Sequence, residues 1–186
     1  MTNDTVAGEQ ILEPSLPIVD PHHHLWDKAG ALLGNLPPSD HGFMDILREI
    51  PRYLLEELLA DLKGGHNVCA TVFMECGAMY RADGPEALRC LGETEFVNGI
   101  AAMTASGLYG DVRACAGIVS SADLRLGSLT EEVLRAHIAA APVRFRGIRQ
   151  RAAYDADPDV LGPLHGRAPP GLYRDTKFRD GFKLLR

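Results

Sequence analysis

Several features that would identify common classes of protein are missing from this sequence of 186 residues. Basic residues are not in excess: 19 Lys and Arg stand against 25 Asp and Glu. The resulting net charge of -6 gives no electrostatic footprint for nucleic acid. No apolar run approaches the roughly 20 residues that cross a bilayer, and the polar start lacks the parts of a signal peptide. We therefore expect a cytoplasmic protein with no nucleic-acid partner and no membrane partner.

Cysteine is also scarce, and its spacing excludes the common cysteine frameworks. The four cysteines form no Cys-x-x-Cys pair and no zinc-knuckle spacing. Cys69 and Cys115 lie in apolar runs typical of strands, where a reduced cysteine usually packs as a small hydrophobe. We expect the cysteines to be reduced and these two to be buried.

Hydrophobic patterning predicts an alternation of strands and helices. Apolar runs with β-branched residues predict strands at 16–20, 67–75, 111–120 and 143–150. Helical spacing of apolar residues predicts helices at 53–63, 94–105, 129–141 and 174–185, and one short helix at 43–49 within the long connection 27–51. In the helix at 129–141, Leu134, Ile138 and Ala141 are expected on one side.

The predicted strand at 67–75 is almost entirely apolar and that at 111–120 repeats its pattern, which is typical of strands buried on both faces of a parallel sheet. Alternating units of this kind favour an α/β fold, either an open doubly wound sheet or a TIM barrel. A doubly wound nucleotide binder carries a glycine-rich turn after its first strand. Here that turn is Pro21-His22-His23-His24, with no glycine before Gly30, so the barrel is favoured.

A complete (β/α)8 barrel takes eight units and about 250 residues. The sequence contains four βα units, so we expect the N-terminal half of such a barrel, with parallel strands. We divide the chain into a flexible tail, 1–15, and a truncated barrel domain, 16–186. A half barrel leaves strand edges unpaired, which favours association, and a homo-oligomer is therefore one expected partner arrangement.

Three consecutive histidines follow the first predicted strand. Because side chains alternate across a strand, His22 and His24 share one face with Asp20, while His23 points to the other face. Two imidazoles on one face can hold one divalent cation, and Asp20 can orient a ligand or tune it without binding the cation itself. Barrel active sites lie at this end of the strands. Solvated loop histidines and a tag remnant are the alternatives, but the run lies between a strand and Leu25-Trp26.

The segment Ile18-Val19-Asp20-Pro21-His22-His23-His24-Leu25-Trp26-Asp27 resembles the first-strand motif of the amidohydrolase superfamily, Asp-x-His-x-His followed by an aromatic residue. It is most similar to the amidohydrolase 2 group of metal-dependent hydrolases, which includes sugar-acid and pyrone lactonases and related decarboxylases. Phe145-Arg146-Gly147-Ile148-Arg149 resembles the fourth-strand motif of that group. The resemblance extends from about residue 16 to the C-terminus.

The resemblance implies a metal-dependent hydrolase acting on a small carboxylated or hydroxylated substrate, with His22 and His24 as metal ligands. The implied cofactor is zinc, with manganese as an alternative, and metal-independent lactonases of the group leave a metal-free reaction open. The group completes its site with histidines on strands five and six and an aspartate after strand eight, which this chain does not reach. The catalytic base is therefore unknown. His66, His137 and His165 are expected to be surface or packing residues.

Ester or lactone hydrolysis is the favoured chemistry. A metal-dependent decarboxylase on the same scaffold is one alternative. A catalytically dead fragment or pseudoenzyme is another, and the missing ligands are the feature that argues for it. We expect the chain alone to be inactive as a hydrolase.

Two further residues are candidates for binding substrate. Arg149 ends the fourth predicted strand, where its guanidinium could hold a carboxylate in a bidentate grip. Glu75 ends the second predicted strand at the same rim, and a buried carboxylate there is costly without a partner. The structural alternatives for Glu75 are capping or an ion pair with Arg81. Trp26 and Tyr154 could line the pocket, although an aromatic residue after a strand more often packs against the rim.

Overall fold

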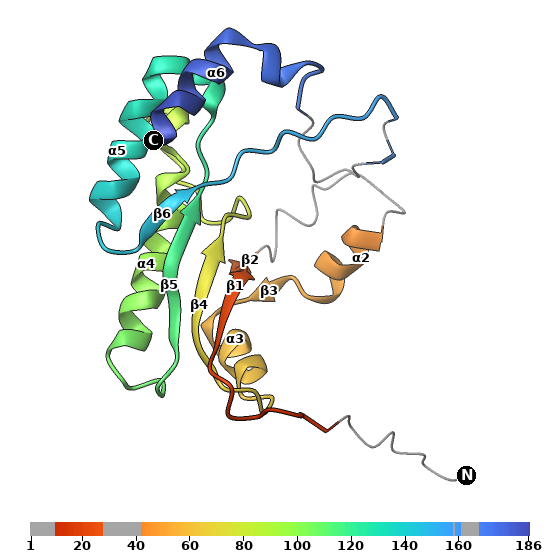
Figure 1. The fold of residues 1–186 in the computed structure, drawn as a ribbon, viewed down its shortest axis with the longest axis vertical. Helices are drawn as coiled ribbons and strands as arrows, with labels where there is room; N and C mark the ends of the chain where they lie inside the picture. Colours follow the sequence, from red (N-terminus) through yellow and green to blue (C-terminus); the bar gives the residue numbers. More distant parts are fainter. Residues whose placement is uncertain (1–9, 28–41, 158, 161–167) are drawn as a thin grey trace.

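The computed structural model describes residues 10–27, 42–157, 159–160 and 168–186. Four strands of the described chain form one sheet in the order β1-β4-β5-β6, and each neighbouring pair is parallel. These strands are β1 (Ile18–His23), β4 (Val68–Met74), β5 (Arg113–Ser120) and β6 (Phe145–Ile148). They follow one another in space as they do along the chain (Figure 1), so the predicted α/β class and parallel strand order are confirmed.

Helices separate consecutive strands, at the predicted positions with ends shifted by a few residues. The larger ones are α2 (Gly42–Glu49), α3 (Leu55–Leu62), α4 (Leu91–Ala105), α5 (Thr130–Ala140) and α6 (Thr176–Phe182). Short 3-10 turns are η1 (Glu86–Leu88), η2 (Leu124–Leu129), η3 (Leu172–Arg174) and η4 (Lys183–Leu185). Two short strands, β2 (Trp26–Asp27) and β3 (Arg52–Tyr53), form an antiparallel pair within the connection between β1 and α3.

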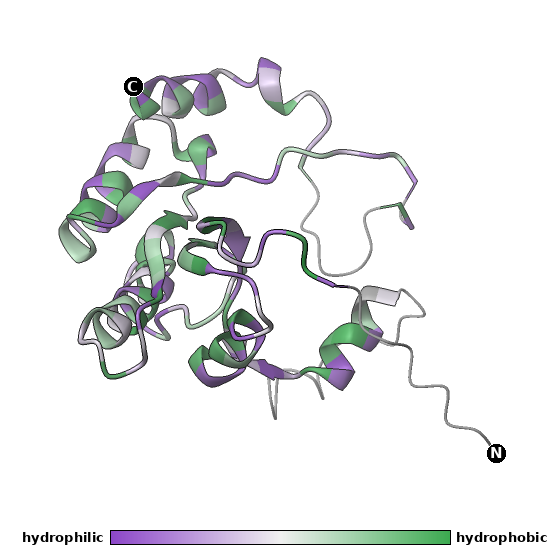
Figure 2. Cartoon of the chain, turned by 60° about the horizontal axis from the view of Figure 1, so that its bottom comes forward, coloured by the Kyte–Doolittle hydropathy of each residue, from purple (hydrophilic) through white to green (hydrophobic). Residues whose placement is uncertain are grey.

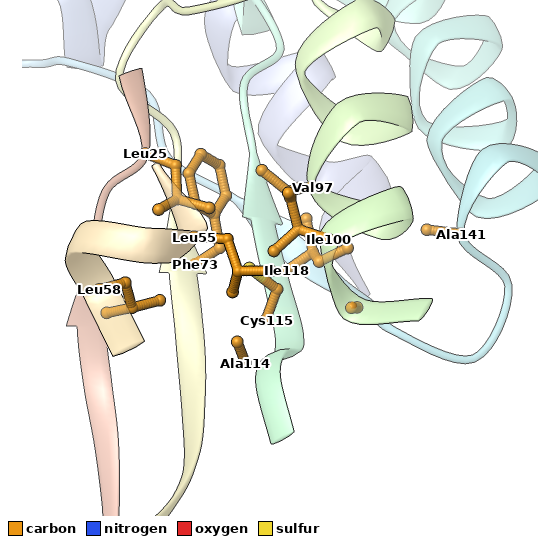
Figure 3. Packing of buried hydrophobic residues seen from close by; sticks show 11 residues of the cluster. Leu25, Leu55, Leu58, Phe73, Val97, Ile100, Ala114, Cys115, Ile118 and Ala141 are labelled. Carbon is orange, nitrogen blue, oxygen red and sulfur yellow. The ribbon is translucent and has the colours of Figure 1, made fainter. Parts of the chain in front are cut away.

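The main core lies between the sheet and the helices α3 and α4. Phe73 of β4 and Ile118 of β5 are fully buried in one cluster with Leu55 of α3 and Val97 of α4 (Figure 3). Complete burial of a side chain of this size contributes about 1.5–3 kcal/mol relative to leaving it exposed. This cluster therefore holds both helices on the same face of the sheet.

Only one face of β4 is fully buried. Thr71 and Phe73 have no exposed surface on the helix-covered face. The residues between and around them, Val68, Ala70, Val72 and Met74, remain partly exposed on the other face. The expectation of burial on both faces is therefore wrong for β4, because α3 and α4 pack on the side of Phe73 alone. In β5, by contrast, the consecutive residues Gly117 and Ile118 are both buried.

The buried side of α5 also differs from the prediction. Val133 and His137 are buried, whereas Ile138 is 51% exposed, so the buried stripe does not run through Leu134 and Ile138. A histidine can replace an apolar residue here because both of its ring nitrogens have partners. Nδ1 lies 2.9 Å from Oγ1 of Thr94 and Nε2 lies 2.9 Å from a backbone carbonyl oxygen.

The two cysteines predicted to be buried have different environments. Cys115 is fully buried, and burial raises the pKa of its thiol to about 12. Cys69 is exposed, so that prediction is wrong: this residue precedes the part of β4 that the helices cover. All four cysteines are free thiols.

In the described part of the chain no helix is long and apolar enough to cross a membrane. The helices instead mix hydrophobic and hydrophilic residues (Figure 2). Of the predicted flexible tail 1–15, residues 1–9 lie outside the described residues, and residues 10–15 contain no helix or strand.

Candidate active site

His22 and His24 lie at the C-terminal end of β1. The strand continues through Pro21 to His23, beyond its predicted end at Asp20, and its pairing with β4 shifts register between Asp20 and His23. Proline has no N–H to donate, which is tolerated at a bulge in an edge strand. This irregularity still leaves the two histidines on one side. Their Nε2 atoms are 3.1 Å apart and their ring planes meet at 84°.

The expected geometry of the histidine pair is therefore confirmed, and His23 points away as expected. Its side chain is buried, with Nε2 lying 2.8 Å from Oγ1 of Thr71. Burial lowers the pKa of His23 to about 4, so its imidazole is neutral at pH 7.

The tautomer of His24 follows from its second ring nitrogen. Nδ1 lies 2.8 Å from the carbonyl oxygen of Met74. A carbonyl oxygen only accepts, so Nδ1 carries the proton and Nε2 of the neutral ring presents a lone pair. Partial burial lowers the pKa of His24 below 6.5, which favours this neutral form. Metal-binding histidines are commonly oriented by such a hydrogen bond from the other ring nitrogen to a carbonyl oxygen.

The donor pair fits two positions around a divalent cation. Two nitrogens bound to one tetrahedral zinc ion lie about 3.3 Å apart, given Zn–N bonds of about 2.0 Å. The observed separation of 3.1 Å between the two Nε2 atoms is close to this value. Among the described residues there is no group of three or more His, Cys, Asp and Glu side chains that could hold a metal ion. The described chain thus provides two ligands, whereas catalytic zinc sites use three protein ligands.

Asp20 acts on the backbone rather than on an imidazole. Its Oδ1 accepts a hydrogen bond from the backbone N–H of His22, 3.0 Å away. This hydrogen bond orients the backbone from which the His22 ring projects, so Asp20 acts on that residue through the main chain. The carboxylate also compensates for the pairing that the bulge at Pro21 interrupts.

Glu75 and Arg149 are brought together by β5. The N–H of Glu75 donates to the carbonyl of Val119, and the N–H of Arg149 donates to the carbonyl of Ser120. The side chains then meet: Nε of Arg149 lies 2.8 Å from Oε1 of Glu75, and Nη2 donates to the Glu75 carbonyl. The alternative ion pair of Glu75 with Arg81 is wrong, since Arg81 pairs with Glu95.

One peptide segment connects this ion pair to the histidines. Met74 accepts the hydrogen bond of His24, and the next residue, Glu75, accepts two hydrogen bonds from Arg149. The relative positions of the metal-ligand candidate and the substrate-binding candidate are therefore fixed through two adjacent residues, the last residue of β4 and the one that follows it.

A pocket of about 350 Å³ lies beside Glu75, at the C-terminal ends of β4, β5 and β6. Three arginines line it: Arg125, Arg149 and Arg151. Arg125 is already paired with Asp123 through three side-chain hydrogen bonds of 2.9, 3.1 and 2.7 Å. Neither His22 nor His24 lines the pocket, so Glu75 is the connection between the histidine pair and this space.

Arg149 is the arginine best suited to meet a ligand in this pocket. Its side chain is 36% exposed, while the Glu75 side chain that it contacts is 5% exposed. Its hydrogen bonds to described residues use Nε and Nη2, which leaves Nη1 for an incoming acceptor. A guanidinium held in this way can bind a carboxylate without first being reoriented.

Sequence reasoning missed Glu93, which supports the loop after β4. This residue of α4 is 1% exposed, and its Oε1 accepts hydrogen bonds from the N–H groups of Cys76 (3.0 Å) and Ala78 (2.8 Å). Burial raises the pKa of Glu93. The sequence feature that could have indicated its burial is its position four residues before Val97, on the same face of the helix.

The other candidates take structural positions. Trp26 stacks on Tyr53 and donates to the carbonyl of Ile50, so it packs against the rim. Tyr154 is 50% exposed and does not line the pocket beside Arg149. His66 is exposed before β4, at the opposite end of the sheet from His22. His165 lies outside the described residues.

Comparison with known proteins finds similarity to the uncharacterized protein y4mH of Sinorhizobium fredii (strain NBRC 101917 / NGR234). The identity is 31% over 177 residues, which cover 91% of this chain and 50% of y4mH. No family model and no solved structure matches the chain. The chain thus spans about half the length of the curated relative that it matches.

Proposed function

We propose that this chain carries the N-terminal half of a metal-dependent hydrolase site. One observation carries the proposal: the Nε2 atoms of His22 and His24 converge to 3.1 Å at the C-terminal end of a parallel strand. Ligand sites in parallel α/β folds lie at that end. Because Nδ1 of His24 donates to Met74, Nε2 of His24 carries a lone pair. Nε2 of His22 lies within hydrogen-bond distance of that lone pair, and in the proposal the cation takes the place of this hydrogen bond.

The cofactor in this proposal is a divalent cation, zinc in the first instance and manganese as the alternative. When bound, it polarises the substrate carbonyl and makes water a stronger nucleophile near neutral pH. His22 and His24 supply two neutral imidazole ligands. Met74 fixes the tautomer of His24, and His23 lies on the opposite face and takes no direct part.

Arg149 supplies the substrate-binding group in this proposal. Its Nη1, which donates to none of the described residues, is the group that would donate to a carboxylate in the 350 Å³ pocket. Glu75 balances the charge of Arg149 when the pocket is empty. A small ester or lactone that also carries a carboxylate satisfies both parts of the site. The scissile carbonyl then lies near the histidine pair, and the carboxylate lies near Arg149.

The fold expected for this function is one half of a (β/α)8 barrel. Two observations support it: the strands follow in sequential parallel order, and the face of β4 that carries Val72 and Met74 is partly exposed. In a complete barrel that face would meet the opposite strands. The relative y4mH is about twice as long as the segment that matches, which leaves room for four further units.

Binding of the reaction product tests this function without requiring turnover. We expect zinc-loaded chain to bind the ring-opened hydroxy acid of a carboxylated γ-lactone in isothermal titration. Arg149→Lys keeps the charge beside Glu75 but removes the planar fork, and it should weaken binding by about tenfold. The methyl ester of the same compound is the control, and its binding should not change in the variant. Zinc-independent binding of the acid would contradict the proposed site.

Product analysis separates hydrolysis from decarboxylation. With zinc and the same lactone, a hydrolase site releases the ring-opened acid, and a decarboxylase site releases carbon dioxide. We expect only slight turnover by this chain, because its described residues supply two metal ligands. Turnover at enzyme-like rates would show that the chain holds a complete site rather than half of one.

A further inference from the structure

The face of the sheet opposite the histidine pair holds a buried polar cluster. His23 is 7% exposed and lies edge-on to Phe73, with ring centroids 5.9 Å apart. Its Nε2 is 2.8 Å from Oγ1 of Thr71, a residue with no exposed surface. Among the described residues, Nδ1 of His23 has no hydrogen-bond partner. Sγ of Cys115 lies 3.7 Å from the same Nε2, so the hydroxyl of Thr71 is the closer of its two polar contacts.

Thr71 is itself fixed by the next strand. Its Oγ1 accepts the backbone N–H of Cys115 at 3.0 Å. Cys115 has a φ of 52°, a left-handed conformation that a non-glycine residue adopts only when its surroundings favour it. The same place shows a register shift between β4 and β5. One hydroxyl group thus connects His23 of β1, Thr71 of β4 and the irregular part of β5.

His23 lies at the end of the β1 bulge, and the conformation of this bulge determines where His22 and His24 lie. The pairing of β1 with β4 is irregular between Asp20 and His23, so ordinary strand pairing does not determine where His22 points. His23 is paired again, with Phe73 as its partner across the strands. Because His22 and His24 flank His23, the position of its buried ring restricts the backbone from which both imidazoles project.

We propose that Thr71 and His23 are positioning residues that hold His22 and His24 at the separation required for a shared cation. This inference rests on the proposed metal site. The hydrogen bond between Thr71 and His23 keeps the middle imidazole on the helix-covered face. Without it, Nδ1 of His23 would still lack a partner and Nε2 would keep only the weak contact with Sγ of Cys115, 3.7 Å away. The end of β1 would then be displaced to bring that ring to water.

Cobalt(II) binding tests this role, measured by competition with a chromophoric chelator and by the visible spectrum of the bound ion. Thr71→Val removes the hydroxyl and conserves the shape, and it should weaken cobalt binding by about 10- to 100-fold. Thr71→Ser retains the hydroxyl and should restore binding to within about threefold of the wild-type chain. Thr104→Val is the matched control, since Thr104 is a fully buried threonine of α4 that contacts neither histidine. It should lower stability without changing cobalt affinity.

A second variant covers the case in which Thr71→Val does not fold. His23→Leu fills the same apolar space, so it should fold. It cannot hydrogen-bond to Thr71, so the end of β1 is no longer fixed to β4 through that bond, and cobalt affinity should still fall. If His23 only fills space, His23→Leu will bind cobalt as tightly as the wild-type chain. That result, or unchanged affinity in a folded Thr71→Val variant, would overturn the positioning role and leave the metal site intact.

A measurement without metal separates this inference from the proposed function. Long-range ¹H–¹⁵N spectra of the metal-free chain should show His24 as the Nδ1–H tautomer, as its hydrogen bond to Met74 requires. Thr71→Val should convert His24 to a mixture of tautomers, and Thr71→Ser should not. If the wild-type chain binds no cobalt, the proposed function fails. An unchanged tautomer in Thr71→Val then overturns the positioning role as well.

Discussion

Arg149 and Glu75 form an ion pair that joins the C-terminal ends of β6 and β4, with 2.8 Å between Nε and Oε1. The two partners are unequally buried, because the side chain of Glu75 is 5% exposed and that of Arg149 is 36% exposed. Removal of the arginine therefore leaves a buried carboxylate without its ion-pair partner. Removal of the negative charge leaves an arginine that water can reach.

The first prediction follows from this asymmetry. Arg149→Met should lower the free energy of unfolding by about 3 kcal/mol, the scale for leaving a buried charge without its partner. Glu75→Gln should lower it by about 1 kcal/mol, because the amide oxygen can still accept from Arg149. Urea denaturation measures both. The double variant should be more stable than the sum of the two losses implies, and simple additivity would contradict the pairing.

Glu93 gives a prediction about pH. Burial raises the pKa of this carboxyl above its ordinary value of 4.5, although the N–H groups of Ala78 and Cys76 oppose the shift. Below pH 4.5 the folded and unfolded chains are both protonated, and the contribution to stability is complete. As the pH rises, the unfolded chain releases its proton first. The free energy of unfolding should therefore fall, by at most about 1.4 kcal/mol per pH unit, until the pH passes the pKa of the folded state.

Glu93→Gln carries no titratable proton and should abolish this fall in stability. Denaturant midpoints at a series of pH values above 4.5 are the measurement. Glu95→Gln is a control on the same helix, because Glu95 is exposed and pairs with Arg81. The control should retain the decline. Parallel pH profiles for Glu93→Gln and the wild-type chain would show that Glu93 is not the group responsible.

Two glycines of α4 give a paired prediction about the loop after β4. A Cβ atom at Gly92 would lie 2.3 Å from the carbonyl oxygen of Met79, whereas a Cβ at Gly99 would have no neighbour within 4 Å. Gly92→Ala should therefore lower the free energy of unfolding by about 2–3 kcal/mol. Gly99→Ala should raise it by about 0.5–1 kcal/mol, since alanine is the better helix former. Thermal or urea unfolding would show the two opposite signs, and a stabilised Gly92→Ala variant would contradict the close contact.

The sheet could be predicted from the sequence because its strands are marked by apolar, β-branched runs separated by helical spacing. The histidine pair could also be predicted, since the period of two places His22 and His24 on one side. The bulge at Pro21 preserves that arrangement while it changes the pairing of β1. The side on which neighbouring residues lie can therefore be predicted even where the pairing of the strand is irregular.

Partners distant in sequence could not be predicted. Glu75 had several arginines available, and its partner Arg149 lies 74 residues away along the chain. Only the placement of both residues beside β5 selects that pair over Arg81. Glu93 was missed for a related reason, and the partners of His137 could not be predicted either. Polar residues on a helix are assumed to face water, and the groups that satisfy them inside come from other elements.

The central claim is that His22 and His24 bind one divalent cation together. Equilibrium titration of the metal-free chain with zinc, followed by competition with a chelator, tests it most directly. We expect a single zinc site in the wild-type chain that His22→Ala and His24→Ala each weaken by at least about tenfold. His66→Ala, at the opposite end of the sheet, should bind zinc as the wild-type chain does. Equal zinc affinity in all four proteins, or no zinc binding by the wild-type chain, would contradict the account.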